Sequence, residues 1–341
     1  MSEQSYLRWL VESTPTSWWH DSGDPAELKT ALEHGTSGVT TNPVLSAQTL
    51  TANAEAWSDL LSEISPDAQP ENRAEQLVAG VASRAAAAVE ITHQQTSGRE
   101  GYACAQVNPS RAADADAMLK MAKRLHACAP NIAVKLPATA AGLDVLEECA
   151  AQGITVTATV SFTVPQVLQI AERYHAGLAR LPAGQMPGQC FAVIMIGRLD
   201  DYLADVAQDG KVNVSHDDVC RAGLAVTKRA YEIYKERNYQ AVLLVAALRG
   251  TYHLTELAGA ELIMSVHPKY QQVFFDSQLP REQLINKPID PQVVDRLCQV
   301  PEFVRAYEPE GMLPEEFITY GVTQRTLSQF IEAGWSRLDK I

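Results

Sequence analysis

The chain has 341 residues, of which 46% are hydrophobic and 20% are charged, and its net charge at pH 7 is −13. This length suits one large α/β barrel or two ordinary domains. The negative charge argues against nucleic acid or an anionic membrane as a partner, although cations gathered in one pocket can still bind an anionic substrate. No apolar run approaches the roughly 20 residues that a membrane-spanning helix needs.

The first residues, Met1–Gln4, lack both the basic region and the apolar core of a signal peptide. The six cysteines are scattered and form no CxxC pair, so we expect reduced, mostly buried thiols in a cytoplasmic protein. The eight histidines form no HExxH motif or similar cluster, and we therefore expect no metal site.

Short β-like runs recur along the chain, and stretches of helical composition lie between them. Eight runs predict strands near 17–20, 38–41, 102–107, 132–135, 154–160, 190–196, 241–245 and 260–264. Helices are predicted over 25–34, 111–127, 140–152, 164–176 and 217–237. This alternation indicates parallel βα units and, most simply, a closed (β/α)8 TIM barrel. A doubly wound open sheet is the alternative, but Asp21–Asp24 is not the Gly-rich GxGxxG turn that such a sheet usually carries.

Two segments exceed a minimal barrel. Residues 46–97 separate the second and third predicted strands and have helical patterning. Residues 268–341 follow the last strand, and we expect a helical C-terminal extension there. Its apolar residues at helical spacing are Leu327, Phe330, Ile331, Trp335 and Leu338. The chain shows no repeat and no evident linker, so we expect a single domain over residues 1–341.

Lys135 is the most informative residue, because it interrupts the apolar run 131–139 between Pro130 and a second proline, Pro137. The run predicts a buried strand, and a lysine at its end is poorly solvated, which disfavours the charged form. A neutral amine is a nucleophile that can form an imine with a carbonyl compound. Alternatively, the side chain reaches the surface or pairs with a carboxylate.

Polar residues also follow the other predicted strands, and in barrels the chemistry lies at the C-terminal strand ends. We therefore expect one mouth to hold a lysine, a carboxylate, several polar groups and two arginines. The candidates are Asp21, Thr41, Asn42, Gln106, Lys135, Thr157, Thr159, Arg198 and Arg249. Each has a structural alternative: Asp21 or, more favourably, Asp24 could cap a helix, Asn42 could be a turn residue, and Thr159 could be an ordinary strand residue.

Several motifs resemble the transaldolase family, in order over most of the chain. They are Asp21-Ser22-Gly23-Asp24, Gly38-Val39-Thr40-Thr41-Asn42-Pro43, Val134-Lys135-Leu136-Pro137-Ala138-Thr139, Gly153-Ile154, Gly197-Arg198-Leu199-Asp200 and Leu257-Ala258-Gly259-Ala260. The tail, with Tyr307–Met312 and Gly334-Trp335, is also similar to longer bacterial transaldolases. The Thr40–Pro43 segment and the lysine strand are specific, and the ordered set is stronger than either alone.

This resemblance implies a class I aldolase mechanism that uses a Schiff base, no metal and no other cofactor. Lys135 matches the imine-forming lysine, and Asp21 matches the carboxylate that handles the hydroxyl proton during carbon–carbon cleavage. Asn42 and Thr159 match residues that hold the substrate and the catalytic water. Thr41 and Thr157 are further candidates for substrate binding.

Arg198 and Arg249 match the clamp for the sugar phosphate, because a guanidinium grips a phosphate with two donors. Arg198 could instead pair with Asp200 or Asp201, which lie nearby in the sequence.

Two features depart from the family pattern. Where transaldolases carry a glutamate on the third strand, this chain has Gln106, and the related fructose 6-phosphate aldolase subgroup is similar in this respect. Glutamate can transfer a proton through a water, whereas glutamine can only position that water. Val193 and Met195 stand where a serine and an aromatic residue are expected, which predicts the loss of one phosphate contact.

We therefore predict a transaldolase-like transfer of a dihydroxyacetone unit from a ketose phosphate to an aldose phosphate, as in the pentose phosphate pathway. The first alternative is a sugar-phosphate aldolase that releases dihydroxyacetone by the same imine chemistry, which Gln106 favours. The second is a catalytically silent sugar-phosphate-binding protein. We expect sugar phosphates as partners, with no nucleic acid and no membrane, and we leave a homodimer open.

Overall fold

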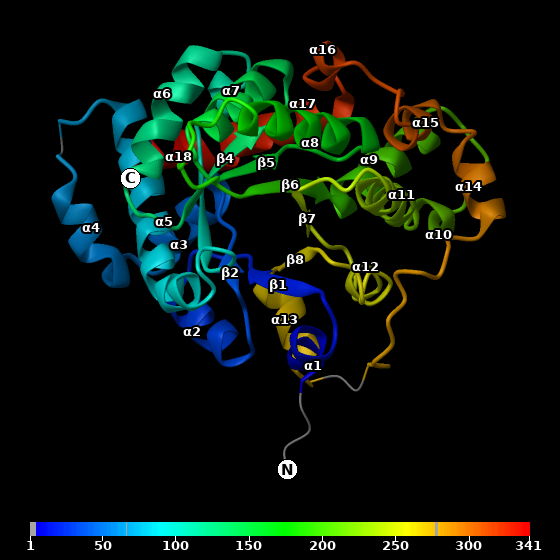
Figure 1. Cartoon of the computed structure of the whole chain (residues 1–341), viewed down its shortest axis with the longest axis horizontal. Coiled ribbons are helices and arrows are strands. Elements are labelled where there is room, and N and C mark those ends of the chain that lie inside the picture. The colour runs from blue at the N-terminus through cyan, green and yellow to red at the C-terminus, as the bar shows by residue number, and fades with distance from the viewer. Residues whose placement is uncertain (1–4, 66, 277–278) are drawn as a thin grey trace.

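A closed barrel of eight parallel strands forms the centre of the computed structural model, which describes residues 5–65, 67–276 and 279–341 (Figure 1). The strands are β1 (Ser17–His20), β2 (Gly38–Val39), β3 (Tyr102–Gln106), β4 (Ile132–Pro137), β5 (Val156–Thr159), β6 (Cys190–Met195), β7 (Val242–Ala246) and β8 (Ile263–Val266). Each strand pairs with the next along the chain, and β8 closes the barrel against β1 with Ser17 opposite Ile263. The predicted (β/α)8 barrel is confirmed, and the open sheet is wrong. Met1–Gln4, which bear on the signal peptide, lie outside the described residues.

Helices surround the strands (Figure 1). Up to β8 they are α1 (Tyr6–Ser13), α2 (Pro25–Glu33), α3 (Pro43–Ala52), η1 (Ala54–Trp57), α4 (Ser58–Glu63), α5 (Pro70–Gln95), η2 (Pro109–Arg111), α6 (Ala115–His126), α7 (Ala140–Ala151), α8 (Val164–Leu178), α9 (Ile196–Asp209), α10 (His216–Val219), α11 (Ala222–Glu236) and α12 (Tyr252–Thr255). None of the described helices combines the length and the apolar character that a bilayer span requires.

The chain turns from strand to helix at residues that cap the new helix. In each case, a side-chain oxygen accepts a backbone N–H of the first turn, which has no partner within the helix. The caps are Asp24 of α2, Asn42 of α3, Asp114 of α6, Thr139 of α7 and Thr163 of α8. Asp24 is therefore the cap that follows β1, which leaves Asp21 free for another role.

Aromatic rings fill the barrel interior toward the N-terminal ends of the strands. Trp19 and Phe191 pack edge to face with their centroids 4.7 Å apart, and Tyr102 packs on Phe191 at 5.6 Å. Tyr102 begins β3, and Phe191 lies next to the start of β6. The candidate residues lie at the other end of the strands, where Gln106 ends β3 and Thr159 ends β5.

Several element boundaries differ from the prediction, and the three largest differences are these. The eighth strand begins at Ile263 and not at residue 260, because the apolar run before it turns back on itself, with the Ala260 N–H donating to the Leu257 carbonyl. The helix predicted over 217–237 is broken between α10 and α11. The helix predicted from 111 begins at Ala115, after the cap Asp114.

The predicted helical extension is confirmed for the described part of residues 268–341. It contains α13 (Pro268–Asp276), α14 (Pro291–Leu297), α15 (Pro301–Tyr307), α16 (Pro314–Phe317), α17 (Gly321–Phe330), the π-helical turn η3 (Ile331–Trp335) and α18 (Ser336–Leu338). Buried Lys228 of α11 anchors the segment of the extension before α14, since Lys228 Nζ donates to the carbonyls of Leu284 and Lys287 at 3.0 and 2.6 Å. At the end, α17 packs on α9 and η3 packs on α3, which returns the chain to the open end of the barrel.

We predict that Gly334→Ala loosens this last packing. A Cβ on Gly334 would lie 2.7 Å from both Pro43 Cβ and Val44 N, so η3 and α3 would have to separate. Overpacking of this kind costs about 1–3 kcal/mol, and thermal unfolding should show a lower Tm. Glu332→Ala, at an exposed residue of the same turn, is the control and should leave Tm close to that of the parent. An unchanged Tm for Gly334→Ala would contradict the close contact.

Candidate active site

A cavity of about 440 Å³ lies at the C-terminal ends of the strands, and its wall has a polar side and an apolar side. The polar side follows the ends of β1 to β5 and carries Asp21, Asn42, Lys135 and Thr159. The apolar side is formed by β6 and β7, where Val193 lies opposite Leu244 and Met195 opposite Ala246 in the strand register. A substrate in the cavity would thus contact polar, reactive groups on one side and apolar side chains on the other.

Lys135 lies inside the barrel, with only 6% of its surface exposed. Its Nζ donates to the backbone carbonyl of Thr41 at 3.0 Å. No carboxylate of the described residues forms an ion pair with it. The Thr41 hydroxyl points elsewhere and donates to the Cys104 carbonyl at 2.7 Å, so Thr41 meets the lysine through its backbone.

Two hydroxyl groups orient the Asp21 carboxylate. Thr40 Oγ1 donates to Asp21 Oδ1 at 2.7 Å, and Ser265 Oγ lies 2.5 Å from Thr40 Oγ1. A hydroxyl has one proton, so Thr40 donates its hydrogen bond to the carboxylate and accepts the hydrogen bond of the Ser265 hydroxyl. This chain from β8 through residue 40 to β1 holds the carboxylate at the cavity wall.

Thr159 and Gln106 present buried polar atoms on the two sides of Lys135. Gln106 lies opposite Lys135 in the register of β3 and β4, and Thr159 lies at the end of β5. Thr159 Oγ1 and Gln106 Oε1 make no hydrogen bond with any described residue. Buried polar atoms generally have partners, so both can receive a water or a substrate hydroxyl.

Gln166 of α8 holds the backbone around Thr159. Val160, the next residue, has φ of +52°, which is an unusual and strained conformation for a β-branched side chain. The fully buried amide of Gln166 donates to the carbonyls of Val160 and Ala138, and it accepts the backbone N–H of Phe162. The ends of β4 and β5, which carry the lysine and the threonine, are thereby joined.

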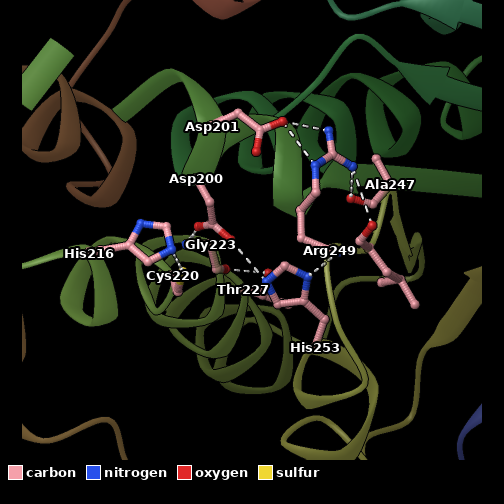
Figure 2. Close-up of polar contacts among 10 residues, drawn as sticks. Asp200, Asp201, His216, Cys220, Gly223, Thr227, Ala247, Arg249 and His253 are labelled. Carbon is pink, nitrogen blue, oxygen red and sulfur yellow. Dashed lines mark hydrogen bonds and ion pairs between the residues drawn. The ribbon is translucent and has the colours of Figure 1, made fainter. Parts of the chain in front are cut away.

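The arginines occupy the rim of the cavity. Arg198 Cζ lies 5.4 Å from the centre of the Phe330 ring, and no carboxylate among the described residues pairs with it. Burial and the neighbouring Arg249 lower the pKa of the Arg198 guanidinium to about 10. Arg249 donates from Nε and Nη2 to Asp201 Oδ2 (Figure 2). Asp200 contacts His253, so the alternative in which Arg198 pairs with Asp200 or Asp201 is wrong.

The N-terminus of α9 adds backbone donors to the same rim. The helix begins directly after Met195, which lines the cavity and provides no side-chain cap. The first N–H groups of a helix lack internal partners and attract anions. These N–H groups, Arg198 and Arg249 make one end of the cavity positive. Arg249 is paired with Asp201, whereas Arg198 has no carboxylate partner among the described residues.

The cavity brings most of the predicted residues together. Those that line it are Asp21, Asn42, Lys135, Thr159, Arg198 and Arg249. Asn42 also caps α3, so its predicted turn role and its place in the wall are compatible. Gln106, Thr41 and Thr157 are not among the residues that line the cavity, and Thr157 Oγ1 lies 3.4 Å from Cys104 Sγ.

Sequence reasoning missed several residues of the wall. Ser265 lies in β8, and His267 and Lys269 follow it. The sequence prediction misses them because it begins the eighth strand three residues before Ile263. Phe330 reaches the wall from the C-terminal extension, a contact over a long stretch of chain that no local pattern reveals. Lys269 adds a third cation to the two rim arginines.

Comparison with known proteins agrees with this geometry. The family described as Transaldolase/Fructose-6-phosphate aldolase matches residues 18–313. A transaldolase of Neisseria gonorrhoeae is 30% identical over 215 residues, which is 62% of this chain and 59% of that relative. A transaldolase of Thiobacillus denitrificans is 27% identical over 314 residues, covering 88% of this chain and 85% of the relative. For the first relatives, the match spans about three fifths of their length.

We predict that Arg198→Met weakens anion binding without destabilising the fold. The pKa of Arg198 is lowered in the folded state, which means that its charge at pH 7 opposes folding. An apolar side chain of similar length removes this unfavourable charge. Tm should stay equal or rise. Calorimetric titration with inorganic phosphate should show affinity about tenfold or more below that of the parent, since charged hydrogen bonds contribute that much.

Arg124→Met provides the matched control. Arg124 pairs with Glu75 at 2.6 and 2.7 Å, neither residue lines the cavity, and this pairing raises the pKa of Arg124. The control should lower Tm slightly and leave phosphate affinity unchanged. A clear loss of stability in Arg198→Met, with phosphate affinity retained, would show that Arg198 is a structural residue.

Proposed function

The chain belongs to the transaldolase/fructose-6-phosphate aldolase family, and we propose that it cleaves a ketose phosphate through an imine on Lys135 and transfers the three-carbon ketone unit to an aldose phosphate. The observation that carries the proposal is the burial of the Lys135 amine in one cavity with Asp21 and two arginines. These are the groups that the reaction needs for imine formation, proton transfer and phosphate binding.

In the first step, the neutral amine of Lys135 attacks the ketone carbon. Loss of one water gives the imine, and the proton transfers that this requires are served by a water between Thr159 and Gln106, whose buried oxygens have no partner among the described residues. The Thr41 carbonyl accepts an N–H of the amine and directs it before attack. The imine then acts as an electron sink for the next step.

Carbon–carbon cleavage follows when Asp21 takes the proton of the hydroxyl on the carbon beyond the scissile bond. The oxygen forms an aldehyde, the bond breaks, and its electron pair moves into the imine to give an enamine on Lys135. Hydrogen bonds from Thr40, and through it from Ser265, keep the Asp21 carboxylate directed at the cavity. The aldose phosphate leaves, and an acceptor aldehyde takes the three-carbon unit by the reverse steps.

The phosphate would lie at the rim. Arg198 carries no ion pair with a described residue, and its pKa is lowered by burial and by Arg249, so an oxyanion there relieves an uncompensated positive charge. The uncapped start of α9 supplies further donors. This supports sugar phosphates as substrates, although the net charge of the chain is negative. The six free cysteines support a cytoplasmic location.

A sugar-phosphate aldolase is the second candidate, and Gln106 is the observation that favours it. An aldolase protonates the enamine and hydrolyses the imine, which releases dihydroxyacetone without an acceptor. Glutamine positions a water but cannot relay its proton, so the outcome depends on how the enamine is protonated. Turnover of a ketose phosphate without added aldose separates the two, because a transferase stalls after one turnover.

We predict that Gln106→Glu shifts the ratio of transfer to aldol cleavage toward transfer. The carboxyl keeps the length of the side chain and restores an ionisable group next to Lys135 on the neighbouring strand. The measurement is the product ratio with and without an acceptor aldose phosphate at a fixed donor concentration. Gln152→Glu, at a helix end outside the cavity, is a control that should leave the ratio unchanged. An active Gln106→Glu variant with the parent ratio would mean that Gln106 does not set the reaction type.

A further inference from the structure

Two neighbouring carboxylates of α9 hold the segment around Arg249 at two points (Figure 2). Asp201 Oδ2 accepts from Nε and Nη2 of Arg249 at 2.9 and 2.6 Å. Asp200 Oδ2 lies 2.9 Å from His253 Nε2, and Nδ1 of the same ring accepts the backbone N–H of Arg249 at 3.1 Å. One carboxylate therefore holds the side chain, and the other holds the backbone through a histidine.

The hydrogen bonds fix the tautomer of His253, which is fully buried. Because Nδ1 accepts a backbone N–H, it carries no proton, and the ring proton of the neutral side chain is on Nε2. Nε2 thus donates to the Asp200 carboxylate. The second oxygen of Asp200 accepts the backbone N–H of Gly223 in α11 at 2.7 Å. Every polar atom of the pair has a partner, and a buried network of this kind is rigid.

The backbone that the pair holds is strained. Ala247 has φ of +60°, a region that few residues other than glycine adopt, and its carbonyl accepts Nη1 of Arg249 at 3.0 Å. Gly197 of α9 packs on this turn, since a Cβ at that position would lie 2.4 Å from the Ala247 oxygen. A strained turn persists only where surrounding contacts hold it, and His253 supplies such a contact at the N–H of Arg249.

Both rim arginines are thereby fixed relative to one helix. Arg198 belongs to α9, and Arg249 is tied to the same helix through Asp200 and Asp201. Four of the five N–H donors of the Arg249 side chain bond to Asp201 and to the Ala247 and Leu248 carbonyls. The remaining N–H, on Nη2, makes no hydrogen bond with a described residue. A phosphate shared by two arginines requires a set separation between them.

We propose that His253 and Asp200 form a positioning unit that fixes Arg249 for the phosphate of the substrate. The proposal rests on the proposed function for the identity of the ligand, and it assigns to His253 a role in phosphate affinity without contact to the reacting carbon atoms. Loss of the unit lets the 247–249 turn relax, which moves Arg249 away from Arg198. Affinity for a phosphate then falls, whereas imine chemistry on Lys135 continues.

The test compares His253→Phe with His216→Phe. The first keeps a buried ring and removes both hydrogen bonds, and the second changes an exposed histidine of the same region that contacts Cys220 (Figure 2). Calorimetric titration with inorganic phosphate needs no catalysis. We expect affinity about tenfold lower for His253→Phe, in the range of a lost hydrogen bond and a displaced charge, and parent affinity for His216→Phe. Borohydride trapping of dihydroxyacetone on Lys135 should be unchanged in both.

A double variant separates positioning from general damage. In the Arg249→Ala background, His253→Phe should cause no further loss of phosphate affinity, because the residue through which it acts is absent. Independent losses that multiply would overturn the proposal, as would equal losses for phosphate binding and for dihydroxyacetone trapping.

Asp200→Asn gives a second test if His253→Phe does not fold. The amide retains the shape but must place a donor against either the His253 Nε2–H or the Gly223 N–H, so phosphate affinity should fall about threefold. Parent affinity in a folded Asp200→Asn variant would overturn the proposal. Failure of the parent protein to bind phosphate would also overturn it. A parent that binds phosphate but traps no ketone would refute only the proposed function.

Discussion

The buried amine of Lys135 is the constraint on which the rest of the site depends. An amine inside a closed barrel needs a polar partner, and the structure supplies one carbonyl, that of Thr41. This carbonyl is available because β2 ends at Val39 and the chain leaves the sheet at Thr40. The same departure lets the Thr40 hydroxyl reach Asp21 and lets Asn42 cap α3. The short segment Thr40–Pro43 thus positions the amine, the carboxylate and a helix at once.

Charge is distributed unevenly over the molecule. The chain carries a net charge of −13, yet the rim of the cavity gathers Arg198, Arg249 and Lys269. Burial of Arg198 without a carboxylate partner opposes folding, and an anionic ligand would offset this opposition. Groups that lower the stability of the free protein in this way are typical of binding sites. The polar network of Asp201, Asp200 and His253 holds the second arginine in place, so the arrangement exists before a ligand arrives.

The barrel and the residues at most strand ends could be predicted from the sequence, because the composition of a strand and the position of its end are local properties. The sequence was insufficient for the depth at which a side chain lies in the barrel. Thr157 pairs with Phe191 of the packed interior in the strand register, and its hydroxyl lies 3.4 Å from Cys104 Sγ, whereas the Thr41 hydroxyl donates to the Cys104 carbonyl. The tilt and stagger of the strands decide which residues reach the level of the cavity. A turn within the apolar run before β8 shifts the start of this strand, so the prediction does not include Ser265. Phe330 lines the cavity only because of how the C-terminal extension packs on the barrel, which no local pattern specifies.

The central claim is that Lys135 forms an imine with a ketose phosphate, and reductive trapping tests it most directly. The protein is incubated with fructose 6-phosphate, treated with borohydride and measured by intact mass, with Lys135→Met as the matched variant. The account predicts an adduct of the three-carbon unit on the parent protein and none on the variant, whose fold should be intact. An adduct of the same mass on Lys135→Met, or a parent protein that forms no adduct with any ketose phosphate, would contradict it.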